Sequence, residues 1–268
     1  MDATSRWILP DLPSTLAWAK EREGQGIRCT LALAGEYART PEGARAGLDE
    51  NLSAVQAIAT AGIGASLSVK PSALGGLSDR DACREHMARV AGEAAGAGVD
   101  LEIDMEGKGY VDLTLGLALA CRERHPRVTV ALQSYLDRTP GDIRRMVAGG
   151  VRVRLVKGAY LGDARDFGEI QRRTGHDARL LKELRAPFSL GTHDPVLIGE
   201  IRQEFGGSRD LVEFGFLKGL SDQTKIALAG EGWVVSEYVP FGPGGEGYVL
   251  RRERYLRELA LAARAPAP

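Results

Sequence analysis

The chain has 268 residues, of which 44% are hydrophobic and 26% are charged, with 35 Lys and Arg against 36 Asp and Glu. This composition is typical of a globular protein, and the formal charge of -1 argues against a nucleic-acid partner. No apolar run approaches the roughly 20 residues of a membrane-spanning helix. Residues 1–14 also lack the basic and apolar regions of a secretion signal. We therefore expect a cytoplasmic protein without a transmembrane segment.

Eight short runs with strand-like composition recur along the chain, and segments with helical spacing separate them. The predicted strands are Cys29–Ala34, Ile63–Val69, Val99–Asp104, Val128–Gln133, Val151–Val156, Phe188–Thr192, Leu211–Leu217 and Trp233–Tyr238. The helical segments include Glu42–Ala61, Asp79–Ala95 and Leu113–Arg124. Regular alternation indicates a parallel sheet, and eight units in about 250 residues favour a (β/α)8 barrel. A doubly wound sheet is the alternative.

No linker interrupts this alternation, so we expect one barrel domain over residues 1–268. Residues 1–27 form an N-terminal helical extension in this interpretation. A last helix is expected over Tyr248–Arg264, and the Ala-Pro-Ala-Pro tail at 265–268 is expected to fray.

Two predicted strands alternate charged with apolar residues. Asp100, Glu102 and Asp104 share one side of the third strand, and Arg152 and Arg154 share one side of the fifth. Alternate side chains of a barrel strand face the lumen, and both strands are odd-numbered, so their inward residues can share layers. Buried charges need partners, and acids facing bases would supply them. Two solvated edge strands are the alternative.

Polar residues recur where predicted strands end. They are Lys70, Asp104, Gln133, Lys157, His193 and Tyr238. The carboxyl ends of the strands carry the chemistry in barrel enzymes. A single residue of this kind is more often a structural part of the rim, but six together indicate an active site.

Cysteine and histidine give no sign of a metal site. Cys29, Cys83 and Cys121 are widely spaced, which indicates reduced core thiols. The four histidines show neither HxH nor HExxH spacing. We therefore expect no metal.

The segment Gly242–Gly247 matches the dinucleotide-binding pattern G-x-G-x-x-G. That site requires a following strand with an acidic residue, and the chain has no room for one. A flexible turn over the barrel mouth is the better interpretation. The pair Arg251-Arg252, early in the last helix, suits a carboxylate or a phosphate, although a solvated basic face is the alternative.

At these residues the sequence resembles the proline dehydrogenase family. The most specific match is the RLVKGAY segment, residues 154–160, together with the paired arginines. Weaker matches, in family order, are Gly35-Glu36, Val69–Ser72, EIDME at 102–106, ALQSY at 131–135, Thr192-His193, Glu213-Phe214 with Leu217 and Gly219, Tyr238–Pro240, and Tyr248.

The resemblance implies a distorted (β/α)8 barrel with the last helix over its mouth. It also implies FAD-dependent oxidation of L-proline to Δ1-pyrroline-5-carboxylate, with electrons passed to a quinone, which would bring the protein to the inner membrane face. A separate pyrroline-5-carboxylate dehydrogenase would take the product.

The resemblance also assigns roles to residues. Asp104 and Arg154 would be catalytic, and Lys70, Arg251 and Arg252 would hold the substrate carboxylate. Tyr238 and Leu217 would form walls around the proline ring, and Glu36 would pair with Arg251 as a gate. The implied FAD-binding residues are Met105, Gln133, Lys157, Gly158, Ala159, Thr192 and His193.

Three residues depart from the family pattern: Asp194, Leu161 and Gly215. They bear on FAD binding more than on the reaction, and a negative Asp194 is expected to point away from a diphosphate. Two other functions stay open. One is a Schiff-base lyase that uses Lys70 or Lys157, and the other is a non-catalytic amino-acid-binding barrel.

Overall fold

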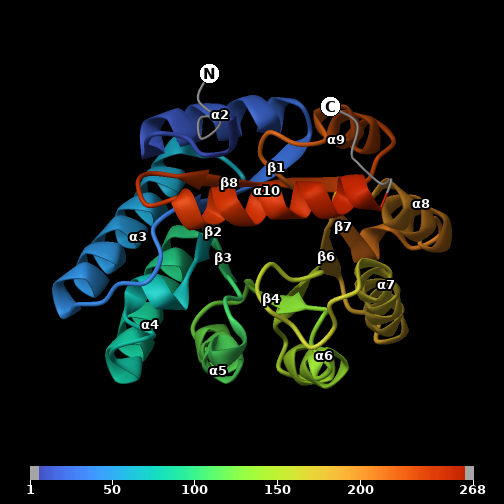
Figure 1. Ribbon diagram of the computed structural model, residues 1–268. Helices are drawn as coiled ribbons and strands as arrows, with labels where there is room; N and C mark the ends of the chain where they lie inside the picture. The colour runs from blue at the N-terminus through green and yellow to red at the C-terminus, as the bar shows by residue number, and fades with distance from the viewer. Residues whose placement is uncertain (1–5, 263–268) are drawn as a thin grey trace.

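The computed structural model describes residues 6–262, and in it eight parallel strands close into a barrel in chain order (Figure 1). The strands are β1 Ile27–Leu33, β2 Ser66–Val69, β3 Asp100–Ile103, β4 Val128–Gln133, β5 Arg152–Val156, β6 Phe188–Gly191, β7 Val212–Leu217 and β8 Val234–Phe241. The (β/α)8 prediction is confirmed and the doubly wound alternative is wrong. The predicted limits of β4 are those observed, and the other limits differ by a few residues.

Helices separate the strands. They are α2 Leu12–Gly24, α3 Pro41–Ala61, α4 Arg80–Ala97, α5 Val111–Arg122, α6 Thr139–Ala148, α7 Phe167–Glu183, α8 Pro195–Glu204, α9 Asp222–Gly230 and α10 Glu246–Leu261, with short 3₁₀ helices η1 Pro71–Leu74, η2 Lys108–Tyr110 and η3 Arg209–Leu211. Local sequence sets their ends. In α3, the side chain of Thr40 accepts the N–H of Gly43 at 3.1 Å, Pro41 opens the helix, and Gly62 ends it in the left-handed conformation.

The apolar core lies between the outward faces of the strands and the surrounding helices. Leu31, Leu67, Leu101 and Val153, on four different strands, are fully or almost fully buried there. The three cysteines are free and buried in the same core, as the sequence predicts. Burial raises the pKa of Cys83 and Cys121 to about 12, so both thiols stay protonated.

The lumen holds charges, and the acids of β3 do meet a base of β5. Arg154 contacts both Glu102 and Asp104. The acids and bases nearer the amino ends of these strands do not pair with each other. Arg152 pairs with Glu213 of β7, at 3.0 Å, and Asp100 pairs with Arg127. The two strands are not solvated edges, since the closed barrel leaves neither strand at an edge.

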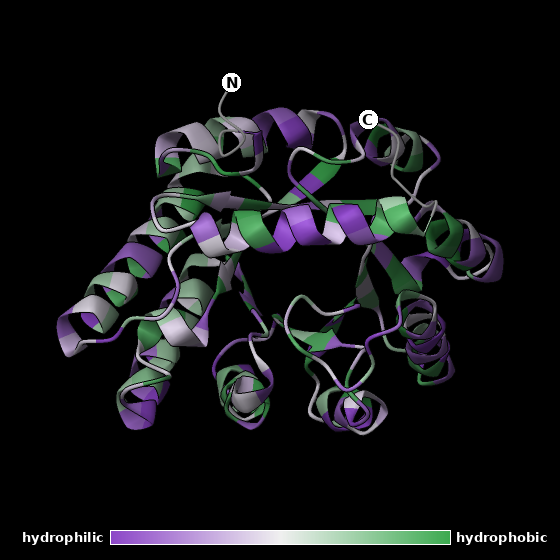
Figure 2. Ribbon diagram, in the orientation of Figure 1, coloured by the Kyte–Doolittle hydropathy of each residue, from purple (hydrophilic) through white to green (hydrophobic). Residues whose placement is uncertain are grey.

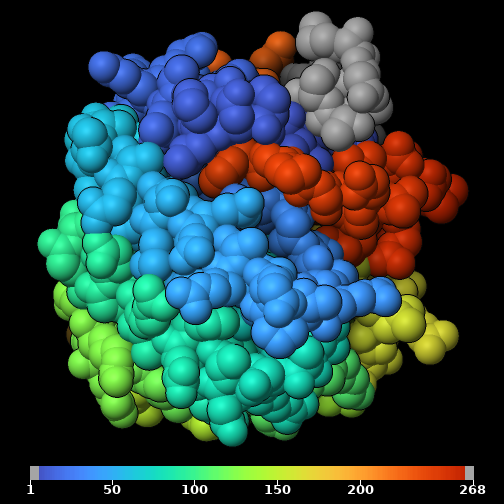
Figure 3. Space-filling view, turned by 90° about the vertical axis from the view of Figure 1, so that its left-hand side faces the viewer, coloured from blue at the N-terminus to red at the C-terminus, as the bar shows by residue number. Residues whose placement is uncertain are grey.

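The helix that follows the last strand does not join the outer ring of helices, and the helix that precedes the first strand takes its place there. Helix α2 packs against β1, β8 and α3, and so completes the outer ring, while α10 lies across the opening of the barrel (Figure 1). Leu9 bridges to Phe241, so the N-terminal segment lies beside the β8–α10 connection (Figure 3). Figure 2 shows α10 with both hydrophilic and hydrophobic residues, as suits a helix that covers a polar site. The predicted tail at 265–268 lies outside the described residues.

The glycine-rich turn between β8 and α10 has a structural explanation. Gly242 and Gly244 have φ values of 83° and 80°, which favour glycine. A Cβ on Gly244 would lie 3.3 Å from the Cα of Gly35, and one on Gly245 would collide with the side chain of Ile8. The turn therefore fits α10 closely onto the end of β1.

Candidate active site

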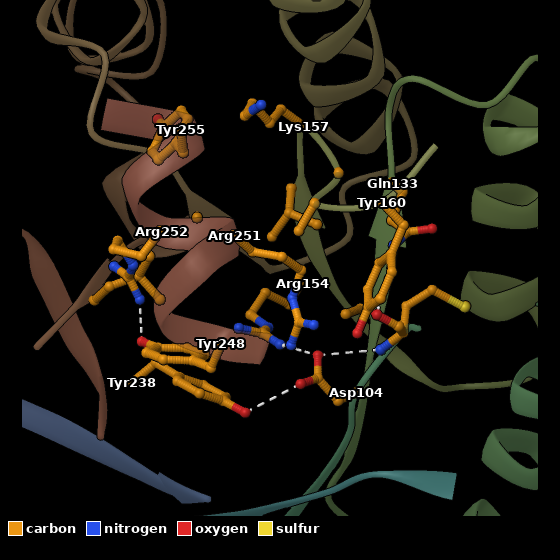
Figure 4. Close-up of a pocket in the computed structure, with 18 of the residues that line it drawn as sticks. Asp104, Gln133, Arg154, Lys157, Tyr160, Tyr238, Tyr248, Arg251, Arg252 and Tyr255 are labelled. Carbon is orange, nitrogen blue, oxygen red and sulfur yellow. Dashed lines mark hydrogen bonds and ion pairs between the residues drawn. The ribbon is translucent and has the colours of Figure 1, made fainter. Parts of the chain in front are cut away.

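A cavity of about 190 Å³ lies at the carboxyl ends of the strands, beneath α10 (Figure 4). It brings together nearly every site residue that the sequence predicts. Those lining it are Lys70, Asp104, Met105, Gln133, Arg154, Lys157, Gly158, Ala159, His193, Leu217, Tyr238, Arg251 and Arg252. Thr192 is the one predicted residue that is not part of the lining.

Asp104 is the centre of a hydrogen-bonded cluster at the end of β3. Its Oδ1 accepts from Nη2 of Arg154 at 2.9 Å and from the N–H of Met105 at 3.1 Å, and its Oδ2 accepts from the hydroxyl of Tyr238 at 3.0 Å (Figure 4). Burial and the charge of Asp104 raise the pKa of Tyr238 well above its usual value. Tyr238 is therefore a neutral donor that fixes the carboxylate.

Arg154 is charged although it is buried. Burial alone would lower its pKa, but Glu102 and Asp104 outweigh burial, and the pKa is raised. Glu102 contacts Nη2 of Arg154 at 3.1 Å, and the guanidinium lies 5.1 Å from the ring centroid of Tyr238. The sequence places Glu102 in the lumen but does not assign it to the site. The feature of the sequence that could have identified Glu102 is its two-residue spacing from Asp104, which places both side chains on the same side of the strand.

Arg252 carries a buried charge without a carboxylate. It is 3% exposed, its Nη2 donates to the hydroxyl of Tyr248, and its Nη1 has no hydrogen-bond partner within residues 6–262. Burial lowers its pKa. An anionic ligand would compensate this buried cation.

Lys70 and Arg251 add positive charge to the same cavity. Lys70 is 6% exposed and donates to the carbonyl of Leu33, and no ion pair joins it to a carboxylate of the described part of the chain. Arg251 pairs with Glu36 and lies 4.8 Å from the ring centroid of Tyr160. The expected ion pair between Glu36 and Arg251 is therefore present.

Lys157, in contrast, is paired with other side chains of the protein. Its Nζ lies 2.7 Å from Oε2 of Glu258 and 4.7 Å from the ring centroid of Tyr255. Burial lowers its pKa, and the contact with Glu258 acts in the opposite direction. Both partners lie on α10, and Glu258 is 101 positions away from Lys157 along the chain. No local pattern in the sequence indicates either contact.

Both ring nitrogens of His193 are also used by the protein. Nε2 accepts the N–H of Leu217 at 3.2 Å, so the proton is assigned to Nδ1, which lies 3.1 Å from Oγ of Ser221. Burial and the nearby Arg252 lower the pKa well below its usual value, so the imidazole is neutral. In the structure, His193 therefore fixes the backbone at Leu217, and its side chain has no free nitrogen for a cofactor.

Thr192 and Gly158 have local structural roles as well. The Thr192 hydroxyl accepts the N–H of Asp194 at 3.1 Å. Gly158 has a φ of 112°, and a Cβ there would overlap the ring of Tyr135. The close packing of Tyr135 on the backbone therefore requires a glycine at position 158, independently of any ligand.

The three departures from the family pattern fall at different places. Asp194 is fully buried and caps α8, accepting the N–H of Val196 at 2.9 Å, and it is not part of the cavity lining. Leu161 is 73% exposed beyond the site. Gly215 lines the cavity, where a Cβ would lie 3.0 Å from Oγ of Ser189.

The position of this cavity, at the carboxyl ends of the barrel strands, is that of the active site in (β/α)8 enzymes. Its buried cations beside the Asp104–Arg154 pair favour an anionic ligand. The family model described as proline dehydrogenase matches residues 15–171. The chain belongs to the proline dehydrogenase family.

Named relatives agree over most of the chain. Proline dehydrogenase 2 of Bacillus subtilis is 29% identical over 252 residues, which are 90% of this chain and 82% of the relative. Proline dehydrogenase 1 of the same organism is 28% identical over 255 residues, covering 92% and 84%. Proline dehydrogenase of Deinococcus radiodurans is 29% identical, covering 90% and 82%.

Solved structures share the fold. Proline utilization A from Bdellovibrio bacteriovorus, inactivated by N-propargylglycine, superposes with a TM-score of 0.84 at 18% identity over 93% of this chain. A mutant of proline utilization A from Bradyrhizobium japonicum gives 0.79 at 20% identity. This chain spans only 32% and 30% of those two longer chains, so the likeness concerns the barrel alone. Within residues 6–262, no helix is long and apolar enough to cross a membrane.

Proposed function

We propose that this protein is a flavin-dependent proline dehydrogenase that oxidises L-proline to Δ1-pyrroline-5-carboxylate, with FAD as cofactor and a quinone as electron acceptor. The observation that carries the proposal is a pair of buried cations, Lys70 and Arg252, that have no carboxylate partner within residues 6–262 and lie beside the Asp104–Arg154 pair in one cavity. Family membership names the substrate that fits these charges.

The residues present fit a flavin. Four buried polar atoms of the lining lack hydrogen-bond partners in the described part of the chain, namely Oε1 of Glu102, Oε1 of Gln133, Nε of Arg154 and Nη1 of Arg252. Of these, Gln133 provides an acceptor and Arg154 a charged donor, which match the edge of an isoalloxazine ring. Bound FAD would supply the two-electron oxidant. The residues that would hold it are Met105, Gln133, Lys157, Gly158 and Ala159. Thr192 and His193 would fix the backbone around the site through their hydrogen bonds to Asp194 and Leu217.

The other residues would bind and orient the substrate. Lys70, Arg251 and Arg252 would hold its carboxylate, because charge-assisted hydrogen bonds to a buried anion are strong. Tyr238 and Leu217 would pack on the ring. Arg154, held by Asp104, would stabilise the negative charge that develops during reduction.

The alternatives are less well supported. A Schiff-base lyase needs a lysine amine free to attack its substrate. Lys157 pairs with Glu258, and Lys70 donates to the carbonyl of Leu33, while family membership favours an oxidoreductase. A non-catalytic binding barrel would have no need of the Asp104–Arg154 pair. We propose further that the protein is cytoplasmic and meets the quinone at the inner membrane face, and that a separate dehydrogenase takes the product.

One spectrum tests the proposal. Purified protein should show flavin absorption, and anaerobic L-proline should bleach it. A protein that takes up no FAD, or whose flavin is not reduced by L-proline, would refute the redox function. Trapping of a carbonyl substrate by borohydride would instead support the lyase.

A further inference from the structure

The lumen of this barrel is polar over most of its height. In (β/α)8 barrels the lumen is ordinarily packed with branched apolar residues. Here alternate positions of the strands bear hydroxyls and charges, among them Thr30, Ser68, Glu102, Ser189 and Ser236, which are all buried. A polar lumen is costly unless it has a use, because each buried polar group must find a partner.

A second cavity enters this lumen from the opposite end of the barrel. It has a volume of about 670 Å³ and is lined at the amino ends of the strands by charged residues such as Arg28, Asp100 and Arg152. Three residues, Thr30, Glu102 and Ser236, line both this lower cavity and the active site. The side chains of these three residues therefore lie between the two cavities, and we call them the barrel floor.

Glu102 is the only titratable residue of these three. It is 5% exposed, and its Oε1 lies 3.1 Å from Nη2 of Arg154, the atom that also donates to Asp104 at 2.9 Å. Oε1 accepts no well-directed hydrogen bond within the described chain. One carboxylate oxygen of Glu102 can therefore accept a further hydrogen bond. The side chain contacts Arg154 of the Asp104–Arg154 pair and also lines the lower cavity.

Charged groups lie on both sides of Glu102. Ser68 of β2, Asp104 at the end of β3, Arg154 of β5 and Glu213 of β7 face Glu102, and Arg28, Asp100 and Arg152 line the lower cavity. Burial raises its pKa, and Arg154 opposes this. Above the substrate cavity, α10 places Arg251 and Arg252, whose charges would oppose an excess proton.

We propose that Glu102 carries the proton released by proline oxidation through the barrel floor to the lower cavity. This inference rests on the proposed function. The substrate ring nitrogen enters as NH₂⁺ and loses one proton to the carboxylates that share Arg154. Bound FAD would supply the two-electron oxidant. The C–H bond of the adjacent ring carbon would then break, its electron pair would leave as hydride to that oxidant, and the nitrogen lone pair would form the C=N bond. Glu102 delivers the released proton to the lower cavity, and its carboxylate is restored.

The test compares Glu102→Gln with Glu204→Gln, a matched change at a glutamate that also pairs with an arginine, Arg179, but belongs to the lining of neither cavity. The glutamine keeps an oxygen toward Arg154 but cannot act as the carboxylate base. Anaerobic stopped-flow reduction by L-proline should be roughly 10²-fold slower in Glu102→Gln, within the usual range for general acid–base groups. Glu204→Gln should reduce at the wild-type rate.

Two further measurements distinguish proton transfer from a structural role. The infrared carbonyl band of a protonated carboxylic acid, followed through an acid titration of the unreacted holoenzyme, should lose one component in Glu102→Gln. Imidazole should accelerate reduction of Glu102→Ala but not of the wild type. Thr129→Leu, at the position paired with Glu102 on β4, narrows the lower cavity while the Glu102 carboxylate is kept. It should slow reduction as well and covers the case in which the Glu102 variants do not fold.

A wild-type rate and pH profile in Glu102→Gln would overturn the inference and leave the proposed function intact. An unchanged infrared spectrum, or a wild-type rate in Thr129→Leu, would overturn it too. A wild type that L-proline does not reduce would overturn both.

Discussion

Two clusters of buried charge differ in how completely the protein pairs them. Between α2, α9 and β8, Lys225 pairs with Glu237 and, at 2.9 Å, with Asp222, while Arg22 lies 2.8 Å from Asp222 and Trp18 donates to Glu237 at 2.7 Å. We call this the α2–α9 cluster.

The mouth cluster, Lys70, Arg251 and Arg252, is different. It has a single carboxylate partner, Glu36 on Arg251, in the part of the chain described by the structure. Burying a charge without its counterion lowers stability. The α2–α9 cluster therefore holds the N-terminal helix to the barrel, and the mouth cluster leaves its charge for a ligand. The following changes test that contrast, from the largest expected effect to the smallest.

Lys225→Met should give the largest effect, and it should fall on stability. Lys225 and Glu237 are fully buried, and removal of one partner of a buried pair costs about 3–5 kcal/mol. Denaturant unfolding measures this loss. L-proline affinity of the folded variant should equal that of the wild type, and a large loss of affinity without a loss of stability would reverse the assignment of the two clusters.

Arg154→Met should act on the reaction. A preorganised charge of this kind contributes about 3–4 kcal/mol, or a factor on the order of 10²–10³ in rate. The variant, with FAD bound, should show slower flavin reduction and a lower flavin potential. If both quantities match the wild type, Arg154 only supports the fold.

Arg252→Met should weaken L-proline binding by about 1.5–3 kcal/mol, roughly one to two decades in affinity. Its stability should behave unlike that of Lys225→Met. Because Arg252 has no carboxylate partner in the described part of the chain, the free energy of unfolding without ligand should be unchanged or higher. A marked destabilisation would show that Arg252 is a structural residue of α10.

Arg251→Met should have a similar or smaller effect on affinity, because Glu36 shares its charge. Glu36→Gln is the matched change on the other partner and should not weaken proline binding, since it frees Arg251. Titration calorimetry with a non-oxidisable analogue compares the two. Weaker binding in Glu36→Gln would show that the ion pair itself, rather than the free arginine, binds the ligand.

The sequence predicts the barrel well because the strand pattern is local. The limits predicted for Val128–Gln133 are those observed. The acid–base alternation predicts acids of the third strand facing bases of the fifth, and the structure confirms this for Arg154 with Glu102 and Asp104 but not for Arg152. The rim residues were found because strand ends of a closed barrel must converge.

The partners of those residues could not be predicted in the same way. Lys157 meets Glu258 only because α10 crosses the mouth, and Lys225 meets Glu237 only because α9 packs on β8. Both depend on how distant segments pack, which no local pattern encodes. His193 likewise was assigned from its place on the rim, whereas its ring nitrogens serve Leu217 and Ser221.

The most direct test of the central claim compares two ligands that differ only in charge. One is cyclopentanecarboxylic acid, and the other is its uncharged amide. Wild-type holoenzyme should bind the acid much more tightly, and Arg252→Met should shrink this preference by roughly one to two decades while binding of the amide stays nearly unchanged. If acid and amide weaken in parallel, Arg252 supports the lid and does not bind the carboxylate, and the account of the mouth cluster is wrong.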